Sequence, residues 1–551
     1  MPFSGFGFRQ KNGNVEEKMR LSRGMLRNLA LVGGCLLTLA LVFHPGAVRA
    51  DWLQDLERDA VAWMTEAGIP GMAIAIVKND VVIYAKGFGH RSNNPSSGLV
   101  DADTVFDIGS CTKAFGAAQL AILADEKQLA WNDPVRNHLS WFKMFDPWVN
   151  RQFQVEDLLC HRSGLSWYSY LGMCFLGYTP GTQVRAIRYQ EPSTSFRSAF
   201  AYQNHMYVAA AKLVAAKTGK LWRENLSERI FEPLGMNRSV TTQADVNQLR
   251  PNVATGHLLL EDGSLARIPH NWTNHFVTDN MLAAGAVKST ANDMAQWLRL
   301  NLALGKFGGR QIVTEGNMRY LQSPRVFVSS WEHGPASPYW GPVSYGLGWM
   351  YFGLAPQPLI THDGTEVGFK ASVLLVPGAN IGIVVLSNLG TDLTSDHKYA
   401  ARVQVPQKLV FRFYDLYFGR ETSLAQLEQQ VLAMEKISGP PPSPPQISPK
   451  EQAPASPLES YVGTYRHPAY GDFVVSLAGG QLEITMGPRQ ISAPLEYNDK
   501  DQQFRAYLPD YHPDYPLYLP FTFNLSSSPA TMTLVTVMGW PQNDVFTRTS
   551  N

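Results

Sequence analysis

Cysteine and surplus charge are both scarce in this chain. Four cysteines occur in 551 residues, too few for a disulfide framework. The sequence does not decide whether Cys160 and Cys174 form a bridge or are free thiols. Their spacing has no accompanying histidine pattern, so no metal site is predicted. Lysine and arginine total 47 against 46 acidic residues, which leaves no basic surplus for nucleic acid or an anionic membrane. We expect a small-molecule or short-peptide substrate and no nucleic-acid partner.

Long hydrophobic runs are also missing from most of the chain. After residue 50 the longest apolar stretch, SVLLVPGANIGIVVLSN, is interrupted by proline, glycine and asparagine, so it is too broken to span a bilayer. Before residue 50, arginines precede an uncharged run over residues 29–43 and a small-residue stretch that ends at Ala50. This layout predicts a signal peptide over residues 1–50, and hence a periplasmic or secreted protein with no membrane span after cleavage. An uncleaved anchor, and a start at Met19 or Met25, stay open.

What is present indicates a globular protein of more than one domain. The apolar fraction is 45% and the charged fraction 17%, and 551 residues are too many for one compact core. Residues 437–457 are so rich in proline that they predict an extended linker. Residues 458–551 hold short β-rich runs separated by turn residues, which predict a small all-β barrel or sandwich. Limited proteolysis is expected to separate this part from an active fragment over residues 51–436.

The part before the linker, residues 51–436, predicts an α/β domain. Residues 51–68 predict an amphipathic helix, and a hairpin should follow with its turn at Asn79 and Asp80. A second apolar hairpin should turn at residues 378–380. Between the hairpins lie helical patterns over residues 111–127, 205–217 and 290–304. A sheet made from both ends of the domain, with helices inserted in the middle, places a cleft where the two meet.

A serine precedes a lysine by three residues in FDIGSCTKAF, residues 106–115. On a helix this spacing puts Ser110 and Lys113 on one face, a turn apart. A buried lysine whose charge is disfavoured can act as a base near neutral pH and activate the serine. The pair alone is weak evidence for a catalytic nucleophile, because Ser395 and Lys398 have the same spacing and an ordinary helix would also produce it. The other motifs in the chain decide between a catalytic pair and an ordinary helix.

Two further motifs follow in order: AYQNHMY holds Tyr202 and Asn204, and THDGTEVGF holds His362 and Gly364 just before the second hairpin. With the stretches VEDLLCHRSGL, IFEPLGMNRS, AAGAVKSTANDMAQWL and YGLGW, the chain resembles the class C β-lactamase-related serine hydrolases of the penicillin-binding protein superfamily over about residues 51–414. The resemblance implies an antiparallel sheet flanked by helices, plus a helical subdomain. The C-terminal part is similar to the lipocalin-like barrel found behind such domains.

The resemblance implies an acyl-transfer role for three of these residues. Ser110 would attack a carbonyl to give an acyl-enzyme, and Lys113 would favour deprotonation of the serine and the tyrosine. Tyr202 would relay the proton to the leaving group and later activate water. The same resemblance implies no metal and no organic cofactor.

It also implies binding roles. Asn204 would hold Lys113 and the substrate, and Gly364 would line the substrate site. The backbone N–H groups of Ser110 and Thr365 would form an oxyanion hole. His362 would hydrogen-bond the tyrosine hydroxyl and help to set its protonation.

The third motif departs from the lysine-threonine-glycine of the β-lactamases proper. A histidine with an ordinary pKa near ~6.5 is mostly neutral at pH 7, so His362 should hold a substrate carboxylate poorly while acyl transfer survives. A rival lysine-x-glycine at residues 306–308 is rejected because it does not lead into an apolar hairpin. Cys111 should point about 100° away from its neighbour on the helix, which predicts a small buried thiol.

The sequence therefore predicts a serine hydrolase (an esterase, amidase or peptidase) that cleaves a small ester or amide. Two alternatives stay open: a D-alanyl carboxypeptidase or weak β-lactamase on cell-wall-like peptides, and an acylated cell-wall-binding or sensor protein without turnover. The oligomeric state is left open.

Overall fold

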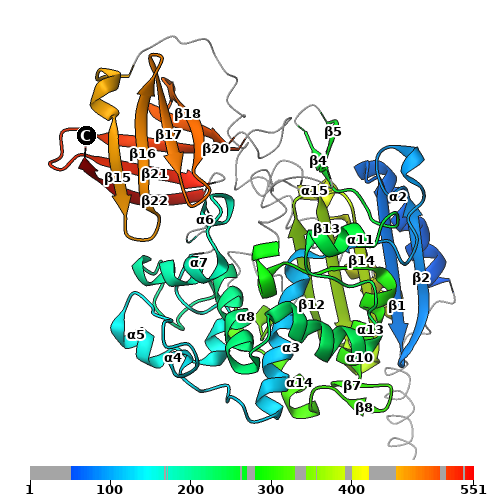
Figure 1. Cartoon of the computed structure of the whole chain (residues 1–551). Helices are drawn as coiled ribbons and strands as arrows, with labels where there is room; N and C mark the ends of the chain where they lie inside the picture. Colours follow the sequence, from blue (N-terminus) through cyan, green and yellow to red (C-terminus); the bar gives the residue numbers. More distant parts are fainter. Residues whose placement is uncertain are drawn as a thin grey trace, which may run out of the picture.

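A computed structural model describes residues 51–166, 169, 172–260, 263–269, 279–328, 343–354, 356–390, 400–420, 454–508, 517–537 and 540–550. The predicted signal peptide and most of the predicted linker lie outside these residues. In Figure 1 a domain built on a long sheet occupies the lower right, and a barrel drawn in orange and red stands above it.

The first domain is organised around an eight-stranded antiparallel sheet in the order β2-β1-β14-β13-β12-β11-β10-β9. Its strands are β1 (Gly71–Lys78), β2 (Val81–Gly89), β9 (Val326–Phe327), β10 (Val343–Tyr345), β11 (Met350–Phe352), β12 (Leu359–Glu366), β13 (Phe369–Val376) and β14 (Ile381–Ser387). The strands β1, β13 and β14 are buried almost throughout, as their continuous apolar runs require. The sheet is thus made from the two ends of the domain, as predicted.

Helices cover both faces of this sheet (Figure 1). On one face lie α2 (Trp52–Ala67) and α16 (Val405–Phe418), whose aromatic rings meet where Trp52 contacts Phe413 edge to face at 5.7 Å. Toward the other face lie α3 (Thr112–Asp125), α8 (Asn204–Thr218) and α13 (Ala291–Leu302). The shorter helices are α4 (Val135–His138), α5 (Pro147–Gln152), α6 (Gly172–Phe175), α7 (Pro180–Ala186), α9 (Trp222–Leu226), α10 (Glu232–Leu234), α11 (Gln243–Gln248), α14 (Glu315–Leu321) and α15 (Ala400–Val403).

The predicted hairpins and helices are present. Asn79 and Asp80 both have positive φ, 50° and 64°, the backbone geometry of a tight two-residue hairpin turn. The second hairpin turns at Asn380, with φ of 47°. Among the described residues, the domain also has three two-stranded sheets: β3 (Phe106–Asp107) with β6 (Lys288–Ser289), β4 (His257–Leu259) with β5 (Leu265–Arg267), and β7 (Lys306–Phe307) with β8 (Arg310–Gln311).

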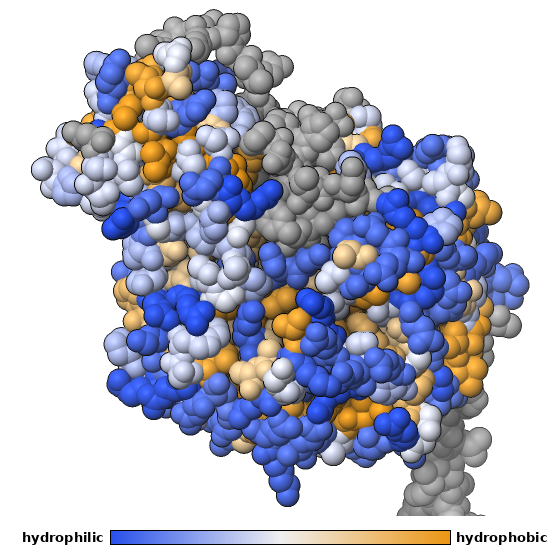
Figure 2. All heavy atoms as spheres, in the orientation of Figure 1, coloured by the Kyte–Doolittle hydropathy of each residue, from blue (hydrophilic) through white to orange (hydrophobic). Residues whose placement is uncertain are grey.

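The C-terminal part is a closed antiparallel barrel of eight strands. They are β15 (Gly463–His467), β16 (Gly471–Ala478), β17 (Gln481–Met486), β18 (Ile491–Asn498), β19 (Gln503–Leu508), β20 (Leu517–Asn524), β21 (Thr531–Val537) and β22 (Trp540–Ser550). Alternate residues of these strands fill the interior, for example Phe473 and Val475 on β16. In Figure 2 apolar residues gather on the visible side of the barrel, whereas the sheet domain presents a largely hydrophilic face.

The barrel packs against the first domain through the segment around α6. One apolar cluster joins Phe175, Leu176 and Tyr178 to the barrel interior, and Figure 1 places α6 at the junction. The hydroxyl of Tyr178 donates to the backbone oxygen of Tyr470. A Cβ on Gly487 would lie 2.6 Å from the carbonyl oxygen of Leu176. The two parts share a packed interface, which the sequence did not indicate.

Cys111, Cys160 and Cys174 are free and buried, so the open alternative of a Cys160–Cys174 bridge is not realised. Cys111 is a small buried thiol, as predicted, and donates to the backbone oxygen of His362 at 3.3 Å. Across the described ranges, no helix combines the length and apolar character that crossing a membrane requires.

Candidate functional site

The predicted nucleophile lies where a strand and a helix meet. Ser110 belongs to a single 3₁₀ turn, Gly109–Cys111, directly before α3, and it is partly exposed. Gly109 has φ of 47°, a conformation that favours glycine. A Cβ at Gly109 would lie 2.6 Å from the backbone oxygen of Thr365. Only a glycine therefore lets the serine turn approach β12 this closely.

Lys113 is fully buried and reaches three oxygen atoms. Its Nζ lies 2.9 Å from Oγ of Ser110, 2.8 Å from Oδ1 of Asn204 and 2.7 Å from the backbone oxygen of Ala284. Burial holds the pKa of the Lys113 amine well below its usual value, because the charged form loses its hydration. A neutral amine has two N–H donors and one lone pair. In the neutral form, the two N–H groups can go to Oδ1 of Asn204 and to the backbone oxygen of Ala284, which leaves the lone pair for the Ser110 hydroxyl.

Tyr202 lies beside this pair. Its hydroxyl hydrogen-bonds Ser110, and burial nevertheless raises the pKa of the Tyr202 phenol. The Lys113 amine lies 4.7 Å from the centre of the Tyr202 ring. On another side, the ring stacks on His161 at 4.1 Å between centroids. Tyr202 thus keeps its proton at rest and can give it to a neighbouring group.

Asn204 is placed by the start of α8. The preceding residue, Gln203, caps this helix by accepting a hydrogen bond from the backbone N–H of His205 at 2.7 Å. Because Gln203 serves as the cap, the Asn204 side chain is left to accept from Lys113. The first two predicted motifs are therefore brought together through Lys113.

The third motif lies on β12, where His362 is 5% exposed. Its Nδ1 lies 2.7 Å from the backbone oxygen of Asp363, and its Nε2 lies 2.9 Å from the hydroxyl of Tyr345. A carbonyl only accepts, so Nδ1 carries the proton and Nε2 accepts from Tyr345. Burial lowers the pKa of His362 to about 3. The imidazole is neutral, as the sequence predicted, but its hydrogen-bonding partner is Tyr345, whereas the sequence indicated Tyr202.

Gly364 and Thr365 pass close to the nucleophile. A Cβ on Gly364 would overlap the backbone oxygen of Ile108 and lie 3.2 Å from the backbone nitrogen of Ser110. The Thr365 hydroxyl accepts from Nζ of Lys370 at 2.7 Å. The backbone groups of Ser110 and Thr365 therefore lie on facing segments, and the oxyanion hole assigned to them stays a prediction.

Four residues at or near the site were not named from the sequence: His161, Tyr345, Glu366 and Lys370. His161 and Tyr345 lie within the stretches VEDLLCHRSGL and YGLGW, which had carried the resemblance as whole motifs. Of the rejected rivals, Ser395 and Lys398 lie outside the described residues. Lys306 is exposed on the short β7–β8 hairpin.

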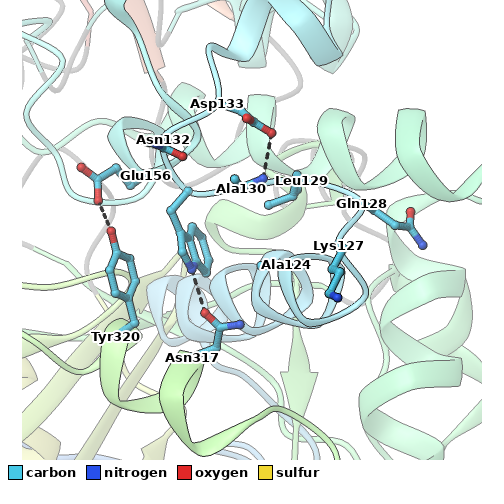
Figure 3. A pocket seen from close by; sticks show the side chains of 11 residues that line it. Ala124, Lys127, Gln128, Leu129, Ala130, Asn132, Asp133, Glu156, Asn317 and Tyr320 are labelled. Atoms are coloured by element: carbon cyan, nitrogen blue, oxygen red, sulfur yellow. Dashed lines mark hydrogen bonds between the residues drawn. The ribbon is translucent and has the colours of Figure 1, made fainter.

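A separate hollow of about 760 Å³ lies near the C-terminal end of α3 (Figure 3). The Trp131 ring stacks on Tyr320 at 5.4 Å, its indole N–H donates to Asn317 at 2.8 Å, and the Tyr320 hydroxyl donates to Glu156 at 2.6 Å. At 1.5 Å per residue, Ala124 in this hollow lies about 21 Å along the helix from Ser110. At that distance its side chains offer no reacting group to the serine.

Among the described residues, no three histidine, cysteine, aspartate or glutamate side chains converge as a metal site would require.

Known proteins resemble the chain in both parts. The family described as Beta-lactamase matches residues 53–405, and a domain of unknown function, DUF3471, matches residues 448–545. Unguisins hydrolase ungD' of Aspergillus campestris (strain IBT 28561) is 28% identical over 424 residues, 74% of each chain. Penicillin-binding protein 4 of Amycolatopsis lactamdurans is 26% identical over 341 residues, 60% of this chain and 83% of the relative.

Among solved structures, the octameric penicillin-binding protein homologue from Pyrococcus abyssi superimposes with a TM-score of 0.55 at 21% identity. The match covers 90% of this chain and 99% of that one. At this identity the likeness concerns the fold.

Proposed function

The chain belongs to the β-lactamase family of serine hydrolases, and on that premise we propose that it cleaves a small ester or amide through an acyl-enzyme on Ser110. The observation that carries the proposal is the set of contacts around Lys113. Its Nζ lies within hydrogen-bond distance of Oδ1 of Asn204, the backbone oxygen of Ala284 and, at 2.9 Å, Oγ of Ser110, and burial lowers its pKa. A buried neutral amine in this position is a general base for a serine nucleophile.

In the acylation step, Oγ of Ser110 bonds to the substrate carbonyl carbon while its proton passes to Lys113. Tyr202 gives its phenolic proton to the leaving oxygen or nitrogen and regains one from Lys113, so the bond to the leaving group breaks. Water then adds to the acyl carbon and loses a proton to the same pair. The bond to Oγ breaks as that proton returns to Ser110.

The backbone N–H groups of Ser110 and Thr365 form the oxyanion hole in this proposal. The close approach of β12 to the serine turn supports the assignment. Each such donor contributes ~3 kcal/mol to the stability of the transition state.

The neutral His362 favours substrates without a carboxylate. Both imidazole nitrogens are occupied, one by a backbone oxygen and one by Tyr345, and a pKa of about 3 leaves the imidazole without a charge to hold an anion. We infer a preference for uncharged short esters and amides over β-lactams and peptides with a free carboxyl end. The arginine-led apolar segment before Ala50 supports an exported enzyme, periplasmic or secreted.

A D-alanyl carboxypeptidase or weak β-lactamase is the second candidate, which the relative named penicillin-binding protein 4 supports. A sensor that is acylated without turnover is the third. Incubation with a fluorophosphonate or a labelled penicillin, followed by peptide mass mapping, tests all three. We expect the label on Ser110, no label on the Ser110→Ala variant, and multiple turnover of a neutral ester. A label that stays on Ser110 with no turnover supports the sensor, and a label elsewhere rejects the mechanism.

A further inference from the structure

Two aromatic rings are exposed on one short loop of the first domain. Trp148 is 56% exposed and Phe145 is 45% exposed. They lie around the start of α5 (Pro147–Gln152), which Figure 1 places at the outer edge of the domain, on the side away from β1 and β2. Large apolar side chains that gather on a surface mark contact sites for a protein or a membrane. This α5 loop, residues 143–151, is therefore a candidate contact surface.

Hydrogen bonds hold the α5 loop in shape. The side-chain oxygen of Asn150 accepts from the backbone N–H of Met144 at 3.2 Å, so the two ends of the loop are joined. Oδ1 of Asp146 accepts from the backbone N–H groups of Trp148 and Val149 at 2.6 and 3.2 Å, which caps α5. A loop that is already ordered loses little conformational entropy when it binds a partner. The two rings are thus presented on a fixed support.

Cations lie at the base of the loop. The hydrogen bond between Met144 and Asn150 brings their neighbours Lys143 and Arg151 to the same end of it. Both side chains are exposed, and so is Arg136 on α4. Within the ranges that the structure describes, none of these three cations forms an ion pair. Their charge is available to an outside partner.

Two arginines extend the positive charge beside the loop. Arg185 lies over the ring of Trp141, 4.4 Å from its centre, and Arg188 donates to the backbone oxygen of Trp141 at 2.7 Å. The two segments that carry this surface, residues 135–152 and 180–191, hold five lysine or arginine residues and two acidic residues. The whole chain has 47 basic and 46 acidic residues, so its total charge did not indicate this local surplus.

The combination of rings and cations matches the surface of a lipid bilayer better than that of a protein. Tryptophan and phenylalanine side chains lie at the headgroup level of membranes, and each lysine or arginine near an anionic surface strengthens binding about five-fold. A stable protein interface buries about 800 Å² on each partner. Two half-exposed aromatic rings offer only about 200 Å². A bilayer needs no larger matching area, because the rings enter it and the cations meet its charge.

We propose that the α5 loop docks on a bilayer that contains anionic phospholipids, with its two aromatic rings at the headgroup level and Lys143 and Arg151 against the lipid phosphates. Binding of this kind uses the surface of the protein and needs no spanning helix. The predicted export would bring the chain next to such a surface. The docking does not depend on acyl transfer at Ser110, so each proposal can fail without the other.

The test is vesicle flotation of the chain after the predicted cleavage, residues 51–551, which includes every described residue. We expect binding to vesicles of equal parts phosphatidylcholine and phosphatidylglycerol, little binding to phosphatidylcholine alone, and weaker binding as salt is added. Lys143→Ala together with Arg151→Ala should weaken binding about 25-fold, five-fold for each lost cation. Lys306→Ala together with Arg310→Ala removes two exposed cations from the β7–β8 hairpin. This pair is the matched control and should bind as wild type does.

Single variants test the aromatic rings. Trp148→Ala and Phe145→Ala should each weaken binding about 10-fold, the loss expected when a half-exposed aromatic ring leaves the interface. Trp148→Phe keeps an apolar ring and should retain most of the binding. Phe327→Ala, at a phenylalanine on β9 that is 58% exposed, is the matched control. All of these variants should hydrolyse a soluble ester at the wild-type rate.

Three results would overturn the docking surface: no binding to the anionic vesicles at low salt, equal binding to both kinds of vesicle, or binding that the loop variants leave unchanged. Fluorophosphonate labelling of Ser110 reports separately on the proposed function, so loss of one result does not obscure the other.

Discussion

The hydroxyl of Tyr345 donates a hydrogen bond to Nε2 of His362 at 2.9 Å. The same Tyr345 hydroxyl lies 3.5 Å from the hydroxyl of Tyr207, which donates to the backbone oxygen of Leu159. The third-motif histidine is thus the end of a buried chain of hydroxyl groups. A side chain held in this way is neutral and fixed, which defines the kind of substrate end that can lie beside it.

Replacing His362 by lysine should bring charge back to this position. We expect His362→Lys to raise kcat/KM for a penicillin relative to a neutral ester by about 10-fold, the gain from one charge-assisted hydrogen bond to the substrate carboxylate. Steady-state kinetics on both substrates measures the ratio. Tyr345→Phe serves as the control, because it removes the hydrogen bond to the histidine without adding a charge. A ratio that stays the same in His362→Lys contradicts this account of the third motif.

The acidic limb of the pH profile should report on Lys113. A general base works only when deprotonated, so kcat/KM for a neutral ester should fall as the pH drops through the pKa of Lys113, which burial has lowered. Asn204→Asp puts a carboxylate 2.8 Å from Nζ in place of the amide oxygen. This change should raise the pKa and move the limb to higher pH by about 1–3 units.

Asn204→Ala is the control for that profile. It removes the same acceptor from Lys113 and adds no charge, so the rate should fall without an alkaline displacement of the limb as large as that of Asn204→Asp. If the acidic limb of the kcat/KM profile lies at the same pH in wild type and Asn204→Asp, Lys113 is not the titrating base.

Glu366 should make the free energy of unfolding depend on pH. Folded, the carboxyl holds its proton up to about pH 8, whereas its ordinary pKa is 4.5. Between these values the folded state binds the extra proton, so this group's contribution to the free energy of unfolding is complete below pH 4.5 and is lost as the pH rises through 8. In Glu366→Gln the melting temperature should fall less between pH 5 and pH 8 than in wild type, as calorimetry can measure. Other titrating groups, such as Lys113, are present in both proteins and cancel in the difference.

The barrel should stay bound after the chain is cut before it. Leu176 is fully buried in the apolar cluster that the barrel shares with the α6 segment, so cleavage within residues 421–453 should give two pieces that elute together in size-exclusion chromatography. Leu176→Asp places a charge in that cluster and should let the pieces separate. Leu221→Asp, at a leucine that is 48% exposed, should not. Separation of the wild-type pieces would restore the independence expected from the sequence.

Local pattern accounts for much of the fold. The turn at Asn79 and Asp80, the strand QLEITM and the helix that follows Ser110 are each set by residues next to one another, so alternation, turn chemistry and helical spacing reveal them. The motif residues could be named because three short stretches occur in a fixed order. Burial strong enough to lower the pKa of Lys113 is a tertiary property, yet the small and apolar residues after it already indicate a helix buried on all sides.

The remaining features depend on contacts that no short pattern contains. Lys113 meets the backbone oxygen of Ala284, which is 171 residues away, and any residue has a backbone oxygen to offer. Glu366 looks like an ordinary turn acid in TEVGF until Gly285 and Lys288 are placed beside it. The packing of the barrel against Leu176 likewise joins two apolar surfaces, and in the sequence each surface looks like part of an ordinary domain core.

The pairing of β1 with β14 also determines when the sheet can form during biosynthesis. Lys78 is aligned with Ile381, so 303 further residues (381 − 78) must be made before these two can pair. At ~5–20 residues per second, the first hairpin waits on the order of 15–60 s with one edge unpaired. During that time its apolar strand GMAIAIVK has no partner on that side, and an unpaired edge of this kind invites pairing with other chains. A nascent chain of this design depends on a chaperone, or on a route that keeps it unfolded, until its last strands emerge.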